Sequence, residues 1–190
     1  RKIFYPALFR SCGQNVIFGR NVTLRHPLRV SLGDNVIVHD DVTLDGKGRE
    51  GNGISIGDNV FLGKGTMLAS VDGTINIKED ASIGCYCRIG SSKHTTIGKK
   101  ALLASYVYVV GADHDSTRTD IPVIDQPNVS RGGATIGDGT WIGTKSTVLD
   151  GVSVGSDCIV GAHSLVTKDV PDFSVIVGSP AKVIRDRRDQ

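Results

Sequence analysis

The chain has 190 residues, a net charge of +2 and a pI of about 8.4. This length suits one domain with a substantial core, and so mild a charge gives no case for a nucleic-acid binder. Glycine contributes 24 residues and aromatic residues only 5%, which is typical of short strands joined by tight turns. No apolar run approaches the ~20 residues of a membrane span.

The first 15 residues lack the six-residue spacing of branched aliphatic residues that follows them. We predict that they form an N-terminal cap, with a short helix over residues 1–10 covering the first repeat, because stacked repeats need a cap at each end. The apolar stretch from Ile3 to Phe9 is too short for the apolar core of a secretion signal.

Residues 16–170 carry an aliphatic residue at every sixth position, with few slips. The cleanest block is Ile136, Ile142, Val148, Val154, Val160 and Val166. A period of six belongs to neither a helix nor a plain strand, but to a coil with one flat face per repeat. Three hexapeptides make one triangular coil, so the sequence predicts six or seven stacked coils of parallel β-structure, with glycine or Asp-Asn at the corners.

Residues 111–133 interrupt the period. This segment is polar, contains Pro122 and Pro127, and holds His114. So long an insertion in a compact solenoid is usually functional, so we predict a protruding functional loop.

Residues 171–190 follow the last repeat. We expect a short strand at residues 174–177 and then a C-terminal helix, because Ser179-Pro180 places a capping residue before a proline at the first helical position. The four cysteines contain no Cys-x-x-Cys pair and are expected to be reduced and packed.

The ordered tail motifs carry a resemblance. Trp141-Ile142-Gly143-Thr144, Val160-Gly161-Ala162, the run Val166–Pro171 and the run Val177–Ile184, together with the hexapeptides and His114, resemble the left-handed β-helix acyltransferases. The similarity is greatest to galactoside, maltose and xenobiotic acetyltransferases and to the sugar O-acetyltransferases of polysaccharide biosynthesis. It implies an all-β, left-handed parallel β-helix, a homotrimer with active sites between subunits, and acetyl-CoA as co-substrate without a required metal.

Acetyl transfer to a hydroxyl needs a base for the acceptor proton and a means of holding two substrates in line. His114 lies where the family's catalytic histidine lies, and histidine changes its protonation near neutral pH. The resemblance also assigns cofactor contacts to Trp141, Thr144, Ala162, Thr167, Lys168, Lys182 and Arg185. Basic residues near the chain end suit the phosphates of coenzyme A.

The acceptor is less defined. The stretch before the loop does not match the acid and amide that bind the acceptor in the galactoside and maltose enzymes. Tyr86, Arg88 and Asp113 are the candidate acceptor contacts. The predicted activity is O-acetylation of a sugar or saccharide-containing acceptor by direct transfer in a ternary complex, in the cytoplasm, where coenzyme A is supplied.

Three alternatives remain. The acceptor could be the amine of a nucleotide-linked sugar, since a histidine base serves both chemistries. A metal enzyme resembling γ-class carbonic anhydrases would need three converging histidines, but the sequence has no His-x4-His pair. A non-enzymatic β-solenoid scaffold would leave the His114 loop without a role.

Overall fold

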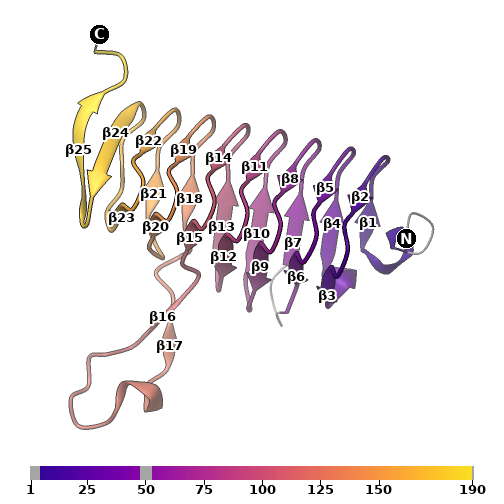
Figure 1. The fold of residues 1–190 in the computed structure, drawn as a ribbon. Coiled ribbons are helices and arrows are strands. Elements are labelled where there is room, and N and C mark those ends of the chain that lie inside the picture. Colours follow the sequence, from indigo (N-terminus) through magenta and orange to yellow (C-terminus); the bar gives the residue numbers. More distant parts are fainter. Residues whose placement is uncertain (1–4, 48–52, 190) are drawn as a thin grey trace.

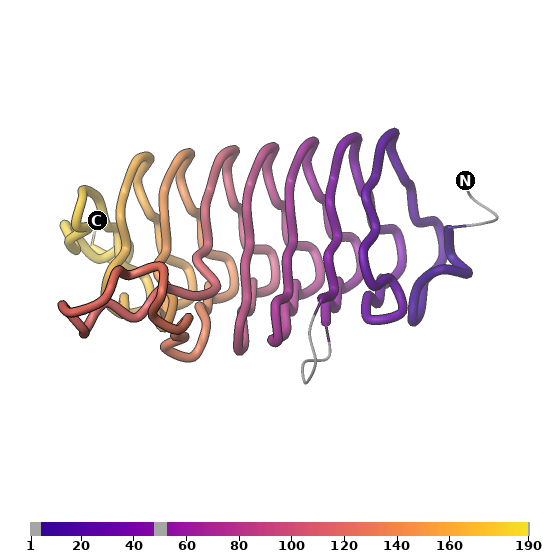
Figure 2. Tube along the Cα trace, turned by 90° about the horizontal axis from the view of Figure 1, so that it is seen from below, coloured from indigo at the N-terminus to yellow at the C-terminus, as the bar shows by residue number. Residues whose placement is uncertain are grey.

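The computed structural model describes residues 5–47 and 53–189. The chain winds into a triangular solenoid whose coils stack along one axis (Figure 1, Figure 2). Each coil passes in turn through three sheets, here called A, B and C, in which successive coils pair in parallel. This is the predicted left-handed β-helix. No helix among the described residues is long and apolar enough to cross a membrane.

Sheet A contains seven strands: β1 (Ser11–Cys12), β4 (Val30–Leu32), β7 (Gly53–Ile56), β10 (Thr74–Ile77), β13 (His94–Ile97), β18 (Thr135–Ile136) and β21 (Ser153–Val154). Sheet B contains nine: β2 (Ile17–Phe18), β5 (Ile37–Val38), β8 (Phe61–Leu62), β11 (Ser82–Ile83), β14 (Leu102–Leu103), β19 (Trp141–Ile142), β22 (Ile159–Val160), β24 (Ser174–Gly178) and β25 (Ala181–Asp186). Sheet C contains seven: β3 (Thr23–Arg25), β6 (Thr43–Asp45), β9 (Met67–Ser70), β12 (Arg88–Ser91), β15 (Tyr108–Val109), β20 (Thr147–Val148) and β23 (Leu165–Val166).

The core is a set of columns of aliphatic side chains inside the triangle. Each residue of the six-residue period points inward and stacks on its counterpart one coil away; Ile83, Leu103 and Ile142, for example, are adjacent in sheet B and fully buried. Small polar residues fill the corners. The Thr140 hydroxyl donates to the Gly155 carbonyl oxygen at 2.7 Å and accepts from the Cys158 N–H at 3.0 Å. The repeat therefore specifies both the core and the backbone hydrogen bonds between coils.

The corner between sheets A and B contains the expected turn residues. Asn35 and Asn59 have φ of 57° and 58°, in the left-handed region that asparagine tolerates. Asp58 Oδ1 accepts the Asp34 N–H at 2.8 Å, so one coil's turn holds the next. The corner between sheets B and C, called the B–C corner below, also has one residue per coil with φ in the left-handed region.

Both ends of the solenoid are covered, in different ways. At the start, a single 3-10 turn, η1 (Pro6–Leu8), precedes Phe9, whose ring stacks on Phe18 with centroids 5.6 Å apart. Of the predicted capping helix, only this turn lies in the described residues; residues 1–4 lie outside them. Another 3-10 turn, η2 (Pro27–Arg29), leads into β4.

The predicted C-terminal helix is wrong. Residues Ala181–Asp186 form strand β25, which pairs antiparallel with β24, and Ser179-Pro180, with a cis peptide bond, makes the turn between them. The helix-start signal at Ser179 gives way because β24 extends sheet B beside β22 and offers β25 a free backbone edge. The β-branched Val183 and Ile184 also favour an extended chain.

The loop 111–133 is present as predicted and projects from the stack (Figure 1). It leaves sheet C after β15 and returns to sheet A at β18, at the corner called the C–A corner below. Its neck is the antiparallel pair β16 (Asp113–His114) and β17 (Asn128–Val129), and its outer part contains one 3-10 turn, η3 (Val123–Asp125).

Candidate functional site

His114 lies in the neck of the loop, on β16. Its backbone pairs with Asn128 across the neck, and Asp115 N–H donates to the Pro127 carbonyl oxygen at 2.9 Å. The Asp113 carboxylate accepts the His114 backbone N–H at 2.9 Å. The imidazole is exposed and has no hydrogen-bond or ion-pair partner among residues 5–47 and 53–189. Its side chain is therefore available to a substrate, and Asp113 orients the backbone of His114 rather than its ring.

The outer part of the loop has its own polar interior. Gln126 is the buried residue within 112–132, with 5% of its surface exposed. Its side-chain oxygen accepts the Arg118 N–H at 3.1 Å, and its amide donates to the carbonyl oxygens of Arg118 and Ile121 at 2.9 and 3.3 Å. The Asp115 carboxylate accepts the Thr117 N–H, and its hydrogen bonds to the backbone and side chain of Thr117 lower the pKa of the carboxyl. The loop is thus held in one shape by side chains that satisfy its backbone.

A hollow of about 170 Å³ lies at the root of this loop. Arg88 and Tyr108 line it from sheet C, where they are neighbours on adjacent coils, and the Arg88 guanidinium lies 5.8 Å from the centre of the Tyr108 ring. Gly111 and Ala112, which also line it, lead directly into Asp113 and His114. Arg88 has no carboxylate partner in the described part of the chain. The hollow therefore joins an unpaired cation and an aromatic ring to the segment that carries His114.

Tyr86 lies close to this hollow in sequence but at a different place on the coil. It occupies the left-handed position of the B–C corner, with φ of 56°, and its ring stacks on that of Tyr106 at 5.3 Å. Tyr106 is at the same position one coil on, with φ of 64°. A positive φ is unusual for a bulky residue, so the backbone here holds two exposed rings together at a turn that elsewhere carries Asn, Asp, Gly, Lys or His.

Thr144 and Ala162 occupy the same B–C corner on the next two coils. The Thr144 hydroxyl donates to the Ser105 carbonyl oxygen at 2.7 Å, and the His163 N–H donates to the Thr144 carbonyl oxygen at 2.9 Å. The structure therefore brings these two predicted cofactor contacts together in one column, which runs parallel to the solenoid axis. Within this column, the Thr144 hydroxyl proton already makes a hydrogen bond, to the Ser105 carbonyl oxygen.

Trp141 projects from sheet B and is 48% exposed. It belongs to a column of outward residues that are in register from coil to coil and almost all apolar: Ile17, Ile37, Phe61, Ser82, Leu102, Trp141 and Ile159. Leu102 and Ile17 are exposed to a similar degree as Trp141. So long an apolar stripe on a sheet surface is typical of a face covered by another protein surface.

The remaining predicted cofactor residues are spread over two regions. Thr167 and Lys168 follow β23 at the C–A corner, whereas Lys182 and Arg185 lie on β25. Lys168, Lys182 and Arg185 have no ion-pair partner in the described residues.

The two arginines that follow β25 are bound within the chain. Arg188 pairs with Asp186, which lowers the pKa of that carboxyl to about 2, and Arg187 donates to the Asp157 carbonyl oxygen. Near the chain end, Arg187 and Arg188 are therefore bound within the chain, whereas Lys182 and Arg185 have no ion-pair partner in the described residues.

One protomer does not bring the predicted site together. His114 is on a loop that projects from the C–A corner, Thr144 and Ala162 are on the B–C corner, and Trp141 is on the face of sheet B. Sequence reasoning missed Tyr106 and Tyr108. The coil register could have found Tyr108, because it lies 20 residues after Arg88, about the length of one coil.

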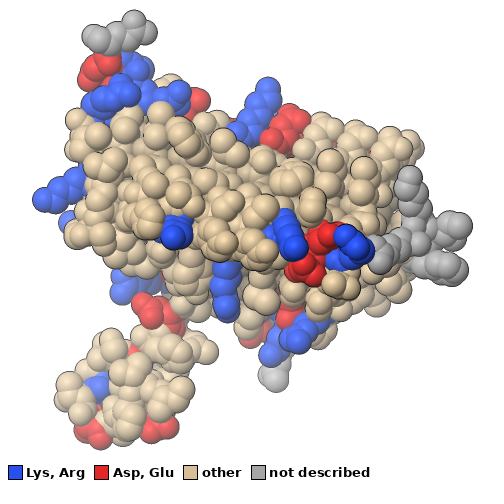
Figure 3. All heavy atoms as spheres, in the orientation of Figure 1, with Lys and Arg blue, Asp and Glu red and all other residues tan. Residues whose placement is uncertain are grey.

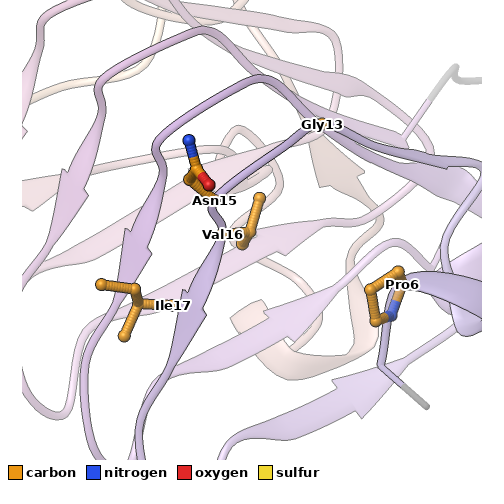
Figure 4. A pocket seen from close by; sticks show the side chains of 5 residues that line it. All are labelled: Pro6, Gly13, Asn15, Val16 and Ile17. Atoms are coloured by element: carbon orange, nitrogen blue, oxygen red, sulfur yellow. The ribbon is translucent and has the colours of Figure 1, made fainter. Parts of the chain in front are cut away.

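Other surface features lie away from these residues. A hollow of about 470 Å³ at the N-terminal end is lined by Pro6, Gly13, Asn15, Val16 and Ile17 (Figure 4), none of them titratable. The face in Figure 3 is mostly covered by uncharged side chains, with Lys, Arg, Asp and Glu scattered over it. Within the described ranges, no group of three or more His, Cys, Asp or Glu residues is placed to hold a metal ion.

Comparison with known proteins matches these features to one family. The family model "Bacterial transferase hexapeptide (six repeats)" matches residues 133–168, and "Hexapeptide repeat of succinyl-transferase" matches residues 53–75. A putative lipopolysaccharide biosynthesis O-acetyltransferase of Escherichia coli is 32% identical over 72% of this chain and 74% of its own length. An E. coli dTDP-4-amino-4,6-dideoxy-D-glucose acyltransferase is 30% identical over 83% of this chain and 82% of its own.

A probable acetyltransferase of Mycobacterium tuberculosis is 30% identical over 85% of this chain, which spans only 55% of that relative. Among solved structures, an N-acyltransferase of Bacillus cereus, in complex with dTDP and 3-hydroxybutyryl-CoA, has a TM-score of 0.68 at 21% identity, covering 98% of this chain and 88% of its own. That similarity shows the shared fold. The repeats, the fold and the curated relatives together show that this chain belongs to the hexapeptide-repeat acyltransferase family.

Proposed function

We propose that the protein transfers an acetyl group from acetyl-CoA to a hydroxyl of a sugar or saccharide-containing acceptor. The observation that carries this is the position of His114: a histidine with a free imidazole, on an ordered loop whose root borders a hollow containing Arg88 and Tyr108. Relatives named as acetyltransferases and acyltransferases support the reaction class. A role in polysaccharide biosynthesis and a cytoplasmic location both fit this pair of substrates.

In the proposed reaction, an imidazole nitrogen of His114 takes the proton of the acceptor hydroxyl as its oxygen attacks the thioester carbonyl carbon. The carbon–sulfur bond then breaks, the acetyl group remains on the acceptor, and the proton passes to the coenzyme A thiolate. Both substrates are bound at once and the transfer is direct, so no acyl-enzyme forms; the proposed step uses no metal. General-base catalysis of this kind contributes roughly 10²–10⁴-fold to the rate.

The cofactor would run parallel to the solenoid axis. Thr144 and Ala162 would contact its acyl and pantetheine part at the B–C corner of one protomer. Thr167 and Lys168 lie at the C–A corner, so they would contact the cofactor from a neighbouring protomer. Lys182 and Arg185 would bind its phosphates, for which their unpaired charges at the C-terminal end are suited. Trp141 would form a wall of the cleft. These assignments come from the resemblance to the family; the unpaired cations of the described residues near the C-terminal end support them.

The acceptor would bind between the loop and sheet C. Arg88 and Tyr108 at the hollow offer a cation and an aromatic ring, which together suit a sugar ring carrying polar or acidic groups. Tyr86, the other proposed aromatic contact, lies apart from the hollow at the B–C corner. Asp113 would take part by fixing the backbone of His114.

We also propose that the active unit is a homotrimer. The apolar column of sheet B, including Leu102 and Trp141, is left exposed in one protomer, and a second copy of the chain would cover it. Assembly would also bring the loop of one protomer to the cofactor residues of its neighbour, which a single chain leaves apart. Leu102→Glu should shift the species seen by analytical ultracentrifugation from trimer to monomer; a trimeric Leu102→Glu protein would place the interface elsewhere.

Two measurements test the function. Acetyl-CoA at about 100 times its dissociation constant should stabilise the folded protein by roughly 2.7 kcal/mol, which a thermal melt detects. A panel of hydroxyl and amine acceptors should then give acetyl transfer to a saccharide hydroxyl.

Exclusive transfer to an amine would favour the alternative, N-acylation of a nucleotide-linked amino sugar, for which the E. coli acyltransferase is the supporting observation. No thermal shift at saturating acetyl-CoA would contradict the transferase proposal and favour a scaffold.

A further inference from the structure

Asp150 is a buried carboxylate that the proposed reaction does not use. It lies at the C–A corner after β20, on the coil that follows the loop, and only 5% of its surface is exposed. A buried charge is costly unless hydrogen bonds satisfy it. Among the described residues, the hydrogen-bond partners of the Asp150 side chain all come from one place, the last residues of the loop.

Three donors from the loop's return segment converge on this carboxylate. The Gly133 N–H donates to Oδ1 at 2.9 Å, the Ser130 hydroxyl donates to the same oxygen at 3.3 Å, and the Arg131 N–H donates to Oδ2. Hydrogen bonds to an ionised acceptor are roughly twice as strong as neutral ones. Asp150 therefore binds the chain just where the loop rejoins the solenoid.

The backbone around this point leaves the loop little freedom. Gly133 has φ of 92°, and a Cβ added to it would lie 2.0 Å from the His94 carbonyl oxygen of the preceding coil. Its own carbonyl oxygen accepts the Gly151 N–H at 2.9 Å. Gly133 is thus held between the preceding coil and the Asp150 coil, and only glycine fits there.

The anchored segment leads directly to the catalytic candidate. Ser130 follows β17, whose residue Asn128 is paired with His114 on β16. Because the imidazole of His114 has no partner of its own in the described residues, its position depends on the backbone of this neck. On the return side, the chain from β17 rejoins the solenoid through the segment that Asp150 holds.

We propose that Asp150 is a positioning residue, which fixes the loop neck and so holds His114 at the reacting atoms. This inference rests on the proposed role of His114 as the base. The carboxylate touches no substrate; it acts through the backbone of residues 130–133. A displacement of about 1 Å at a reacting group can reduce a rate by about 100-fold, so loss of this anchor should lower kcat strongly.

The test uses Asp150→Asn, which keeps the side chain's size but replaces one acceptor oxygen by an N–H₂ donor facing the loop's donors. Hydrogen exchange of the amides in residues 113–129 should accelerate by about tenfold or more, as expected for loss of a charge-assisted hydrogen bond. The kcat should fall by about 100-fold while the KM for acetyl-CoA stays unchanged. Ser130→Ala, which removes one donor, should show a smaller change in the same direction.

The matched control is Asp138→Asn. Asp138 is also a corner aspartate and accepts a single backbone N–H, from Lys99 at 2.8 Å, at a corner that does not contact the loop. It should leave loop exchange and kcat unchanged. Loop exchange in Asp150→Asn no faster than in Asp138→Asn would overturn the anchor, and faster exchange with unchanged kcat would overturn the positioning role.

The base assignment is tested separately, by His114→Ala. That variant should lose activity with loop exchange unchanged. Full activity of His114→Ala would remove both the base and the positioning role, whereas the anchor itself is decided by the exchange measurement alone.

Discussion

The coils of the solenoid and the loop of residues 111–133 are held together by different means. A coil buries a column residue such as Leu103 completely and bonds to both neighbours through its backbone. The loop buries only Gln126 within residues 112–132 and is held by a few side-chain contacts, chiefly those of Gln126 and Asp150. Stability therefore resides in the repeats, while the loop is free to carry chemistry at little cost to the fold.

The register of the coils shows how cleanly the two regions separate. Val109 pairs with Val148, and Thr135 pairs with Ser153. If residues 112–132 are left out, the run Val109-Val110-Gly111-Gly133-Ala134-Thr135 has the same spacing as Val148-Leu149-Asp150-Gly151-Val152-Ser153. The loop is an insertion at one peptide bond of an otherwise regular coil.

Removal of residues 112–132, joining Gly111 to Gly133, should give the largest effect. The joined coil keeps the regular spacing and should fold, but Asp150 loses the Ser130 and Arg131 donors. The melting temperature should therefore fall by several degrees, about what a loss of 1–3 kcal/mol produces. Acetyl transfer should fall to background because His114 is lost. Activity assays and thermal melts check both parts. A joined chain that fails to fold would show that the loop stabilises the coils.

Leu103→Ala tests the other region. Truncating a fully buried leucine should lower the free energy of unfolding by about 2–5 kcal/mol, through lost burial and the cavity left behind. Well below the melting temperature, kcat should be unchanged because the loop is not touched. Chemical denaturation and initial-rate assays measure these effects. A large loss of kcat in folded protein would mean that the column and the loop are coupled.

Thr140→Val should have a smaller effect on the coils. The side chains are similar in shape, but the hydroxyl that bridges the Gly155 carbonyl oxygen and the Cys158 N–H is lost. Leaving a buried polar group unsatisfied costs about 1–3 kcal/mol, so denaturation should show a decrease of this size. Because Thr140 is remote from the loop, loop exchange should match the wild type. An unchanged unfolding midpoint would show that the bridging hydroxyl is dispensable.

The two cysteines of one B–C corner should differ in reactivity, which is the subtlest effect. Burial raises the pKa of the Cys87 thiol to about 11, so at pH 8 only about one Cys87 in a thousand is the reactive thiolate. Cys85, half-buried at the turn itself, should be alkylated first in the native protein. Mass spectrometry after brief labelling measures this, with Cys85→Ser as the control. Equal labelling of both would show that the coil opens readily.

The sequence predicts the coils well because the same six-residue pattern of inward aliphatic residues recurs in every coil. The inward columns, the corner glycines and the interruption at 111–133 all follow from the period. The C-terminal helix fails because Ser179-Pro180 is a local signal, whereas strand β25 depends on the free edge that β24 offers.

Prediction of the candidate site is limited in the same way. The proximity of Arg88 and Tyr108 follows from coil register, yet the contact of Asp150 with residues 130–133 depends on how a non-repeating loop returns, and no period encodes that.

The central claim is that an inert, repeated scaffold presents one catalytic histidine on an inserted loop. The most direct test is the steady-state kinetics of His114→Ala, compared with its thermal melt and acetyl-CoA affinity. We predict that kcat falls by roughly 10²–10⁴-fold, while the melting temperature and acetyl-CoA binding match the wild type. A folded His114→Ala protein that transfers acetyl groups at the wild-type rate would contradict the account.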